Sequence, residues 1–104
     1  MKVISGFLKG REIKGYNIIG TRPTMDRVKE SIFSIIQDKI KDSIVLDLFS
    51  GSGTYGIECI SNYAKEVHFN DHNKECIKII KNNLEKFNIL ERCTITNLDY
   101  LKYQ

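Results

Sequence analysis

A glycine-rich stretch with a carboxylate at its start is the part of this sequence best suited to hold a ligand. It reads Asp-Leu-Phe-Ser-Gly-Ser-Gly-Thr-Tyr-Gly over residues 47–56, where an apolar run gives way to a helical pattern. Glycines at such a turn let a ligand approach the backbone, and the following helix offers unpaired N–H groups. The G-x-G-x-x-G spacing also fits a dinucleotide site with Asp71 as its ribose-binding acid, or simply a tight turn.

Asp47 favours one cofactor over the other. A dinucleotide-binding strand is normally apolar up to its first glycine, whereas here a carboxylate lies four residues before Gly51. Burying a carboxylate costs on the order of several kcal/mol unless it is paired or hydrogen-bonded. Asp47 is therefore expected either to hold N–H groups of the loop or to face a sulfonium or ammonium group, and it would repel a pyrophosphate. We expect S-adenosyl-L-methionine rather than NAD.

Two further acids follow the next two strand-like runs. Asp71 ends the second run, where a carboxylate is placed to accept hydrogen bonds from both ribose hydroxyls, with His72 beside it. Asp99 follows the third run, where it is placed to accept the adenine amino group, with Tyr100 against the purine. One such acid alone is more typical of a helix cap or a solvated loop. Three acids at the carboxyl ends of successive strands together indicate one binding edge.

Alternating strand and helix patterns must position this edge. Apolar runs predict strands at 44–49, 67–70 and 93–96, and the first is apolar on both faces, as in a buried parallel strand. Helical patterns at 54–62 and 73–87 separate them. This alternation predicts right-handed crossovers and a parallel sheet with helices on both faces.

The residues before the first strand predict a helix and a hairpin. The helix follows Pro23, with Thr24 as its expected N-cap. Apolar residues at steps of four predict one buried face, which consists of Val28, Ile32, Ile36 and Ile40, widened by Phe33 and Ile35. Upstream, β-like pieces split by glycines predict a β-hairpin over residues 2–13 with its turn near Lys9-Gly10.

Composition and charge bound the class of protein. A chain of 104 residues, 41% hydrophobic and 28% charged, fits one small globular domain. It has no apolar run long enough for a membrane span and no export signal, so we expect a cytoplasmic location and no membrane partner. Residues 1–29 carry seven bases and two acids, net +5, whereas residues 30–104 carry nine bases and eleven acids, net −2. A basic N-terminal part suggests a polyanionic partner.

The three cysteines lack metal-ligand spacing and predict buried free thiols and no metal.

Residues 47–58 resemble the cofactor motif of the RsmD-type 16S ribosomal RNA guanine-N2 methyltransferases, and the resemblance covers the chain from Val3 to Leu101. Outside that motif it is carried by Ile4-Ser5-Gly6, Lys9-Gly10-Arg11, Thr21-Arg22-Pro23-Thr24 and Asp26-Arg27-Val28-Lys29-Glu30 with Phe33. The resemblance implies S-adenosylmethionine as cofactor and 16S rRNA in the small ribosomal subunit as partner. It implies a guanine exocyclic amine as substrate, and the guanine must leave its stack to reach a pocket.

The resemblance also implies roles for single residues. Asp47, Gly51 and Gly53 would shape the methionine pocket, while Asp71 would bind ribose and Asp99 adenine. The basic hairpin and residues 22–24 would face RNA or the cofactor. The candidate cofactor-binding residues are Asp47, Phe49, Gly51, Ser52, Gly53, Asp71, His72, Asp99, Tyr100 and Thr24. The candidate RNA-binding residues are Lys9, Arg11, Lys14, Arg22 and Arg27, and no catalytic residue is assigned.

One family feature has no counterpart in this sequence. The family's catalytic signature is an Asn/Asp-Pro-Pro-Tyr/Phe loop after the fourth strand, but Pro23 is the only proline here. We therefore expect an α/β, Rossmann-like SAM-dependent methyltransferase fold, truncated after the third strand, with an N-terminal β-hairpin and helix. Residues 1–22 would form a basic β-hairpin arm, and residues 23–104 the helix and the first three βα units, within a single structural domain.

Several functions remain open at this point. The chain is the cofactor-binding N-terminal part of a 16S rRNA methyltransferase and inactive alone, or it is a non-catalytic SAM- or RNA-binding module completed by a partner chain. A dinucleotide-binding domain is the third interpretation. The strand at 44–49 is central in the family's usual strand order, so without its neighbour it would present an unpaired apolar edge. Such an edge predicts self-association.

Overall fold

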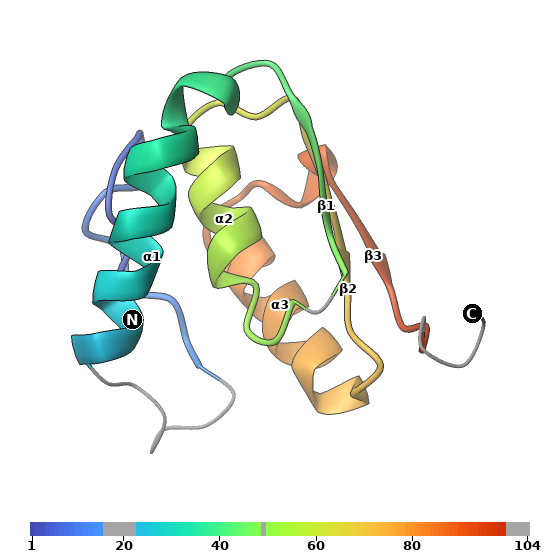
Figure 1. Cartoon of the computed structure of the whole chain (residues 1–104). Helices are drawn as coiled ribbons and strands as arrows, with labels where there is room; N and C mark the ends of the chain where they lie inside the picture. Colours follow the sequence, from blue (N-terminus) through green and yellow to red (C-terminus); the bar gives the residue numbers. More distant parts are fainter. Residues whose placement is uncertain (16–22, 49, 100–104) are drawn as a thin grey trace.

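Three parallel strands form the sheet of this protein, and the labelled helices lie on one side of it (Figure 1). The computed structural model describes residues 1–15, 23–48 and 50–99, without the side chains of 23–26. The elements are α1 (Pro23–Ile36), the 3-10 turn η2 (Gln37–Lys39), β1 (Ile44–Asp47), α2 (Thr54–Ser61), β2 (Glu66–Asn70), α3 (Lys74–Lys86), the 3-10 turn η3 (Leu90–Arg92) and β3 (Cys93–Thr96). The expected alternation of strands and helices is confirmed, although β1 ends at Asp47 rather than at residue 49.

The strand order β1-β2-β3 explains why the helices share one face. Val45 pairs with Val67, and Val67 with Cys93, in parallel register. Both crossovers advance in the same direction, and right-handed crossovers that advance in one direction place their helices on one face. The prediction that helices cover both faces of the sheet is therefore wrong for the described residues. The other face of β1 is open, because Ile44 and Leu46 are each 66% exposed, and β1 is not the doubly buried strand predicted from its sequence.

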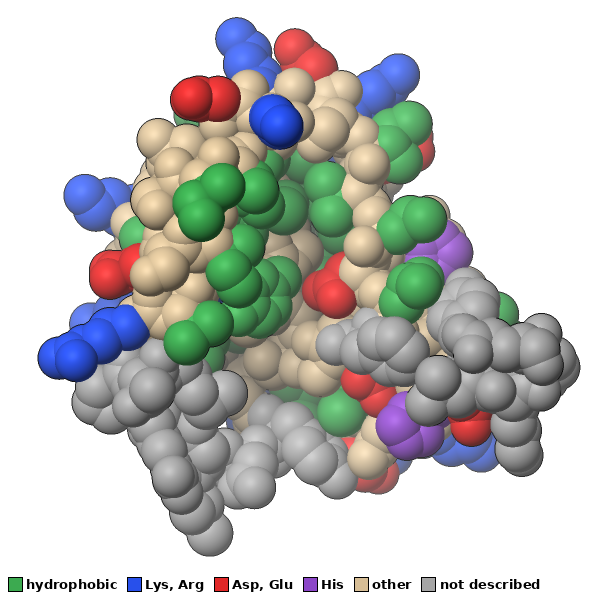
Figure 2. Space-filling view, viewed as in Figure 1, with side chains coloured by type: hydrophobic (Ala, Val, Ile, Leu, Met, Phe, Trp, Pro, Cys, Tyr) green, Lys and Arg blue, Asp and Glu red, His purple; other side chains and the backbone are tan. Residues whose placement is uncertain are grey.

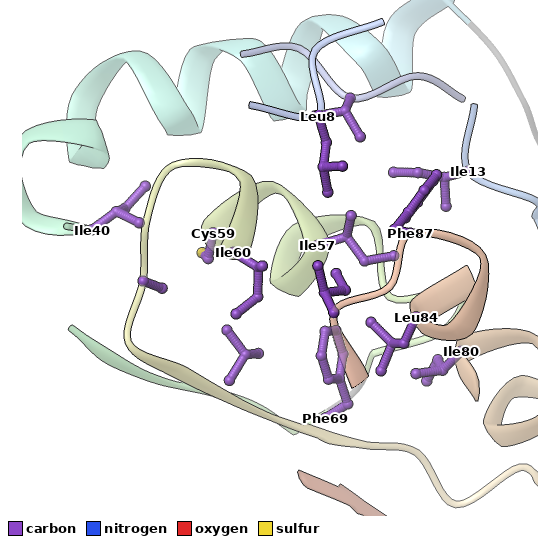
Figure 3. Packing of buried hydrophobic residues seen from close by; sticks show 14 of the residues in the cluster. Leu8, Ile13, Ile40, Ile57, Cys59, Ile60, Phe69, Ile80, Leu84 and Phe87 are labelled. Atoms are coloured by element: carbon purple, nitrogen blue, oxygen red, sulfur yellow. The ribbon is translucent and has the colours of Figure 1, made fainter. Parts of the chain in front are cut away.

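The hydrophobic core fills the space between the sheet and the helices (Figure 3). Phe69 projects from β2 into this space and, like Ile57 of α2 and Ile80 of α3, is fully buried. Gly56 allows α2 to lie close to the sheet, since a Cβ atom at this position would lie 2.2 Å from Cε1 of Phe69. The last glycine of the G-x-G-x-x-G spacing therefore serves helix–strand packing and does not face a ligand.

Helix α1 differs from its prediction at its start and on its buried face. It begins at Pro23, a position that needs no intrahelical N–H donor, so Thr24 lies inside the helix and is not its N-cap. Lys29, Phe33 and Ile40, the residue that follows η2, are buried, whereas much of the predicted face is exposed. The exposed residues are Val28 at 49%, Ile32 at 39% and Ile35 at 78%. No described helix is long and apolar enough to cross a membrane.

The N-terminal segment, residues 1–15, forms a looser structure than the expected hairpin. Its ladder is a single antiparallel bridge between Lys2 and Glu12. The segment packs on the carboxyl end of α2, where the Phe7 N–H donates to the Ser61 carbonyl at 3.0 Å. Gly6 has a φ of +84°, and a Cβ atom there would lie 1.9 Å from the same carbonyl oxygen. These contacts join the segment to the core instead of leaving it as a free arm.

Candidate functional site

The buried side chain of Asn70 joins the carboxyl ends of the three strands. Its Nδ2 donates to the carbonyls of Leu48 and Leu98, each at 2.9 Å. Its Oδ1 accepts from the Leu98 N–H at 2.9 Å and from the Thr96 hydroxyl at 2.7 Å. Leu48 follows β1, Asn70 ends β2 and Leu98 follows β3. One amide therefore fixes the edge of the sheet at which parallel α/β folds bind ligands.

This amide also brings the three predicted acids to one edge. Asp47 immediately precedes Leu48, Asp71 follows Asn70, and Asp99 follows Leu98 in the sequence. Asn97 adds a further link between the second and third strand ends, because its Nδ2 donates to the Asp71 carbonyl at 2.8 Å. The main chain at these three acids therefore lies at one edge of the sheet, while the clustering of their side chains and their roles toward a ligand stay predictions.

The glycine loop, residues 50–53, turns between β1 and α2 with two residues in the left-handed region. Gly51 has a φ of +58° and Gly53 a φ of +85°. A Cβ atom on Gly51 would meet no atom of the described residues within 4 Å, so the backbone here borders open space among them. At Gly53 a Cβ atom would lie 3.3 Å from the Phe69 ring. The first glycine thus leaves room for a ligand, whereas the second turns the chain against the core.

Asp71 holds this loop in place. It is 8% exposed, its Oδ2 accepts from the Gly51 N–H at 2.9 Å, and its Oδ1 accepts from the Asn73 N–H at 2.9 Å. Asp71 therefore supports the loop at Gly51, while Asp47, for which the sequence suggested such support, accepts hydrogen bonds from Ser50 and from the Gly56 backbone. Each carboxylate oxygen has two lone pairs, so both retain capacity for a ribose hydroxyl. His72 is exposed, and its Nδ1 lies 3.6 Å from Oδ1 of Asp71.

Asp47 carries the one buried side-chain polar atom without a hydrogen bond among the described residues, its Oδ2. Burial raises the pKa of this carboxyl, and the charge of Asp71 raises it further, while hydrogen bonds from Ser50 and from the Gly56 backbone act in the opposite direction. An unpaired buried acceptor is costly and needs an explanation. A cationic or N–H-bearing ligand group at the mouth of the glycine loop would supply the missing partner.

The structure describes some of the remaining candidate residues but not all of them. Asp99 is half-buried and Ser52 lies in the glycine loop. Phe49, Tyr100 and Arg22 lie outside the described residues, as does the side chain of Thr24. Among the basic candidates, the side chains of Lys9, Arg11, Lys14 and Arg27 are exposed.

The basic candidates are spread along the N-terminal segment and α1. Lys9 lies near the turn that packs on the end of α2, since the neighbouring Leu8 N–H donates to Ser61 Oγ at 2.9 Å. The Arg11 guanidinium lies 5.1 Å from the centre of the Phe87 ring. The backbone of Lys14 contacts Asn83, which also contacts the glycine loop. Lys14 is thereby linked to the glycine loop through Asn83.

Besides Asn70, two buried features of the site were missed by the sequence analysis. The Lys29 ammonium and Glu58 Oε1 form an ion pair of 2.9 Å with side chains 1% and 0% exposed. The second is Asn83 of α3, which is 1% exposed. A signal existed for Glu58, because it interrupts an otherwise apolar helical pattern, whereas Lys29 lies in a stretch rich in charged residues. No local pattern marks Asn83, since its contact with Lys14 spans 69 residues.

No metal-binding group of histidines, cysteines and acids occurs in the described part of the chain. The cysteines are free, and two of them, Cys59 and Cys76, are buried as expected, while Cys93 is half-buried. Burial is the main cause that raises the pKa of Cys59 to about 12, so this thiol stays protonated at neutral pH. The thiols therefore act as small apolar side chains.

Comparisons with known proteins match nearly the whole length of this chain. The family model described as Conserved hypothetical protein 95 matches residues 1–103. Ribosomal RNA small subunit methyltransferase D from Buchnera aphidicola subsp. Acyrthosiphon pisum is 39% identical to this chain. The match spans 96% of this chain and 53% of that protein. The protein of the same name from Haemophilus influenzae is 38% identical, with 98% and 55% covered.

Solved structures extend the match to three dimensions. The structure of yhhF from Escherichia coli has a TM-score of 0.87 and 28% sequence identity to this chain. It covers 99% of this chain, which in turn covers 55% of that structure. The expected Rossmann-like fold is confirmed, and the chain spans about half the length of the curated relatives that it matches.

The raised pKa of Asp47 predicts a pH dependence of stability. The folded chain holds this proton more tightly than the unfolded chain, whose carboxyl titrates near 3.8, so the free energy of unfolding falls as pH rises from 3.8 through the folded pKa. We expect Asp47→Asn to remove this penalty and to raise the free energy of unfolding at pH 7 by about 1–3 kcal/mol.

Urea unfolding of the two proteins at pH 7 and at pH 4 measures this difference, which should shrink at the lower pH. The matched control is Asp38→Asn, because Asp38 is an exposed acid in η2. Equal stabilities of the two variants at pH 7 would contradict the buried charge penalty.

Proposed function

Because this chain belongs to the family of ribosomal RNA small subunit methyltransferase D, we propose that it binds S-adenosylmethionine and serves in the methylation of ribosomal RNA. The observation that carries this proposal is the unpaired, buried Oδ2 of Asp47 beside a glycine loop whose Gly51 backbone borders open space. A carboxylate there fits the positively charged methionine end of the cofactor. It would repel the pyrophosphate of a dinucleotide, which makes the third interpretation unfavourable.

The three strand ends divide the cofactor among them in this proposal. Asp47, Gly51 and Gly53, with Phe49 and Ser52, surround the methionine part. Asp71 and His72 are assigned to the ribose and Asp99 with Tyr100 to the adenine, and Thr24 is kept as a further cofactor-binding candidate. The cofactor supplies an electrophilic methyl group, and the residues of this chain bind and orient it.

The substrate side of the proposal is a guanine N2 in 16S rRNA of the small ribosomal subunit. The net charge of +5 over residues 1–29 supports a polyanionic substrate, with Lys9, Arg11, Lys14, Arg22 and Arg27 as phosphate contacts. An exocyclic amine inside a helix is not accessible, so the base must be flipped out. The alternative is a non-catalytic SAM- or RNA-binding module that a partner chain completes.

The open side of β1 supports a role for such a partner. β1 has β2 as its one strand neighbour in the described sheet. Ile44, Leu46 and Leu48 of this region are exposed, and hydrophobic side chains gather on the face between α1 and β1 (Figure 2). Unpaired backbone groups next to exposed apolar side chains form a template for another strand. We propose that two copies of this chain associate through the edge of β1 when no other partner is present.

Cofactor binding is the direct test of the proposed function. We expect calorimetric titration with S-adenosylhomocysteine to give saturable binding and titration with NAD to give none. Asp47→Ala should weaken the binding of S-adenosylhomocysteine at least about tenfold, since a charge-assisted hydrogen bond is worth about 1.5–3 kcal/mol. Asp38→Ala, at an exposed acid, should leave it unchanged. Equal binding of NAD, or binding by Asp47→Ala as tight as by the unmodified chain, would contradict the proposal.

We expect the isolated chain to catalyse no methyl transfer. The catalytic Asn/Asp-Pro-Pro-Tyr/Phe motif does not occur in this sequence, whose one proline is Pro23. We expect no transfer of labelled methyl groups from S-adenosylmethionine to small ribosomal subunits above the rate seen with Asp47→Ala. Methyl transfer by the isolated chain at a rate typical of enzymes, about 1 per second or more, would overturn this expectation.

Self-association through β1 predicts a defined mutational effect. Multi-angle light scattering of the chain should show a dimer whose fraction rises with concentration, and Leu46→Lys should shift it to monomer. Leu90→Lys is the control, because Leu90 is 40% exposed but lies in η3, away from β1. A monomer at every concentration, or an equal effect of the two variants, would argue against association through this edge.

A further inference from the structure

Two buried side chains link the N-terminal segment to the glycine loop and to the helix that follows it. Asn83 of α3 forms the first link. Its Nδ2 donates to the Lys14 carbonyl at 3.0 Å and to the Ser52 carbonyl at 3.1 Å. Its Oδ1 accepts from the Lys14 N–H at 3.0 Å. One fully buried amide therefore holds the main chain of the segment and the main chain of the loop at the same time.

Lys29 of α1 forms the second link by a different route. Its Nζ donates to the Lys2 carbonyl at 3.3 Å and to the hydroxyl of Thr54, the first residue of α2, at 2.7 Å. Its partner Glu58 accepts from the Ile4 N–H at 2.9 Å. Both ends of the N-terminal segment are thus connected to the helix end of the glycine loop, at Ser52 and Thr54, through side chains from α3 and α1.

We infer that Asn83 is a positioning residue through which the N-terminal segment and the glycine loop order each other. The consequence is that RNA bound to the segment and cofactor bound to the loop strengthen each other's binding. This inference rests on the proposed function, which assigns Lys14 to RNA and the loop to the cofactor.

The physical basis lies in how Lys14 is held. Its side chain is exposed, whereas its N–H and its carbonyl both bind Asn83. A phosphate that immobilises Lys14 therefore also immobilises the amide that holds Ser52. A ligand that orders one part reduces the ordering cost for the second ligand, and this coupling is reciprocal. Couplings of this kind typically change affinity about 5–150-fold.

A binding cycle tests the coupling. S-adenosylhomocysteine is titrated into the full chain with and without a saturating short, guanine-containing single-stranded RNA. We expect the RNA to tighten the binding at least about fivefold. Asn83→Ala should reduce this ratio to about one, because the link between segment and loop is then removed. Asn82→Ala is the matched control, since Asn82 is the exposed neighbour in the same helix. A ratio of about one in the unmodified chain, or an unchanged ratio in Asn83→Ala, would overturn the inference.

Amide hydrogen exchange without any ligand gives a second readout. Asn83→Ala should accelerate exchange at Lys14, whose N–H loses its acceptor, and also at Gly53, whose N–H donates to the Ser50 carbonyl inside the loop. Exchange in β2 should stay unchanged, which shows that the core is intact. Acceleration at Lys14 without acceleration at Gly53 would refute the positioning role.

The two readouts separate this inference from the proposed function. If the chain binds no S-adenosylhomocysteine, the proposed function fails for this chain and the inferred mutual strengthening fails with it. The exchange experiment then still decides whether Asn83 positions the loop. If the cofactor analogue binds but RNA does not change its affinity, the proposed cofactor site stands and the coupling is wrong.

Discussion

The buried amide of Asn70 is the interaction on which the site depends, because it satisfies main-chain groups of two neighbouring strand ends at once. A buried amide without partners costs on the order of several kcal/mol, whereas here Nδ2 donates twice and Oδ1 accepts twice. Fully satisfied polar networks rigidify the structure around them. The Asn70 amide therefore positions the strand ends at which Asp47, Asp71 and Asp99 lie.

The Lys29–Glu58 pair imposes a second constraint, on the helix layer. Removal of one partner from a buried pair costs about 3–5 kcal/mol, although the intact pair contributes little net stability. The pair is tolerated because Thr54, Lys2 and Ile4 satisfy its remaining hydrogen-bonding capacity. Turning Lys29 inward rotates α1, so that Val28 and Ile32 face outward, contrary to a prediction from apolar spacing alone. One charge pair therefore determines both how the N-terminal segment packs and which apolar surface remains uncovered.

Sequence patterns predicted the local elements and the glycine loop but not the long-range contacts. The strand Cys93–Thr96 was predicted with its observed bounds, because alternation and composition act within a few residues. Asp47 was singled out because a carboxylate inside an apolar run is visible in the sequence, and Asp71 because it follows a strand-like run. The structural roles of Asn70 and Asn83 were not predicted, since no sequence pattern distinguishes a buried, hydrogen-bonded asparagine from one on the surface. The open face of β1 depends on strand order, which local periodicity does not contain.

The unsatisfied features of the described residues concentrate around one strand. Elsewhere, buried polar side chains such as Asn70, Asn83 and Glu58 have partners. β1, in contrast, combines an open backbone edge, exposed apolar side chains and the unpaired Oδ2 of Asp47. Natural proteins satisfy most rules of packing and hydrogen bonding, and the exceptions tend to occur at functional sites. The exceptions at β1 are of two kinds, since an open strand edge can pair with another strand and an unpaired carboxylate can bind a cation. A partner strand along β1 would lie next to the cofactor end of the sheet, so completion of the sheet and binding of the cofactor would occur at adjoining places.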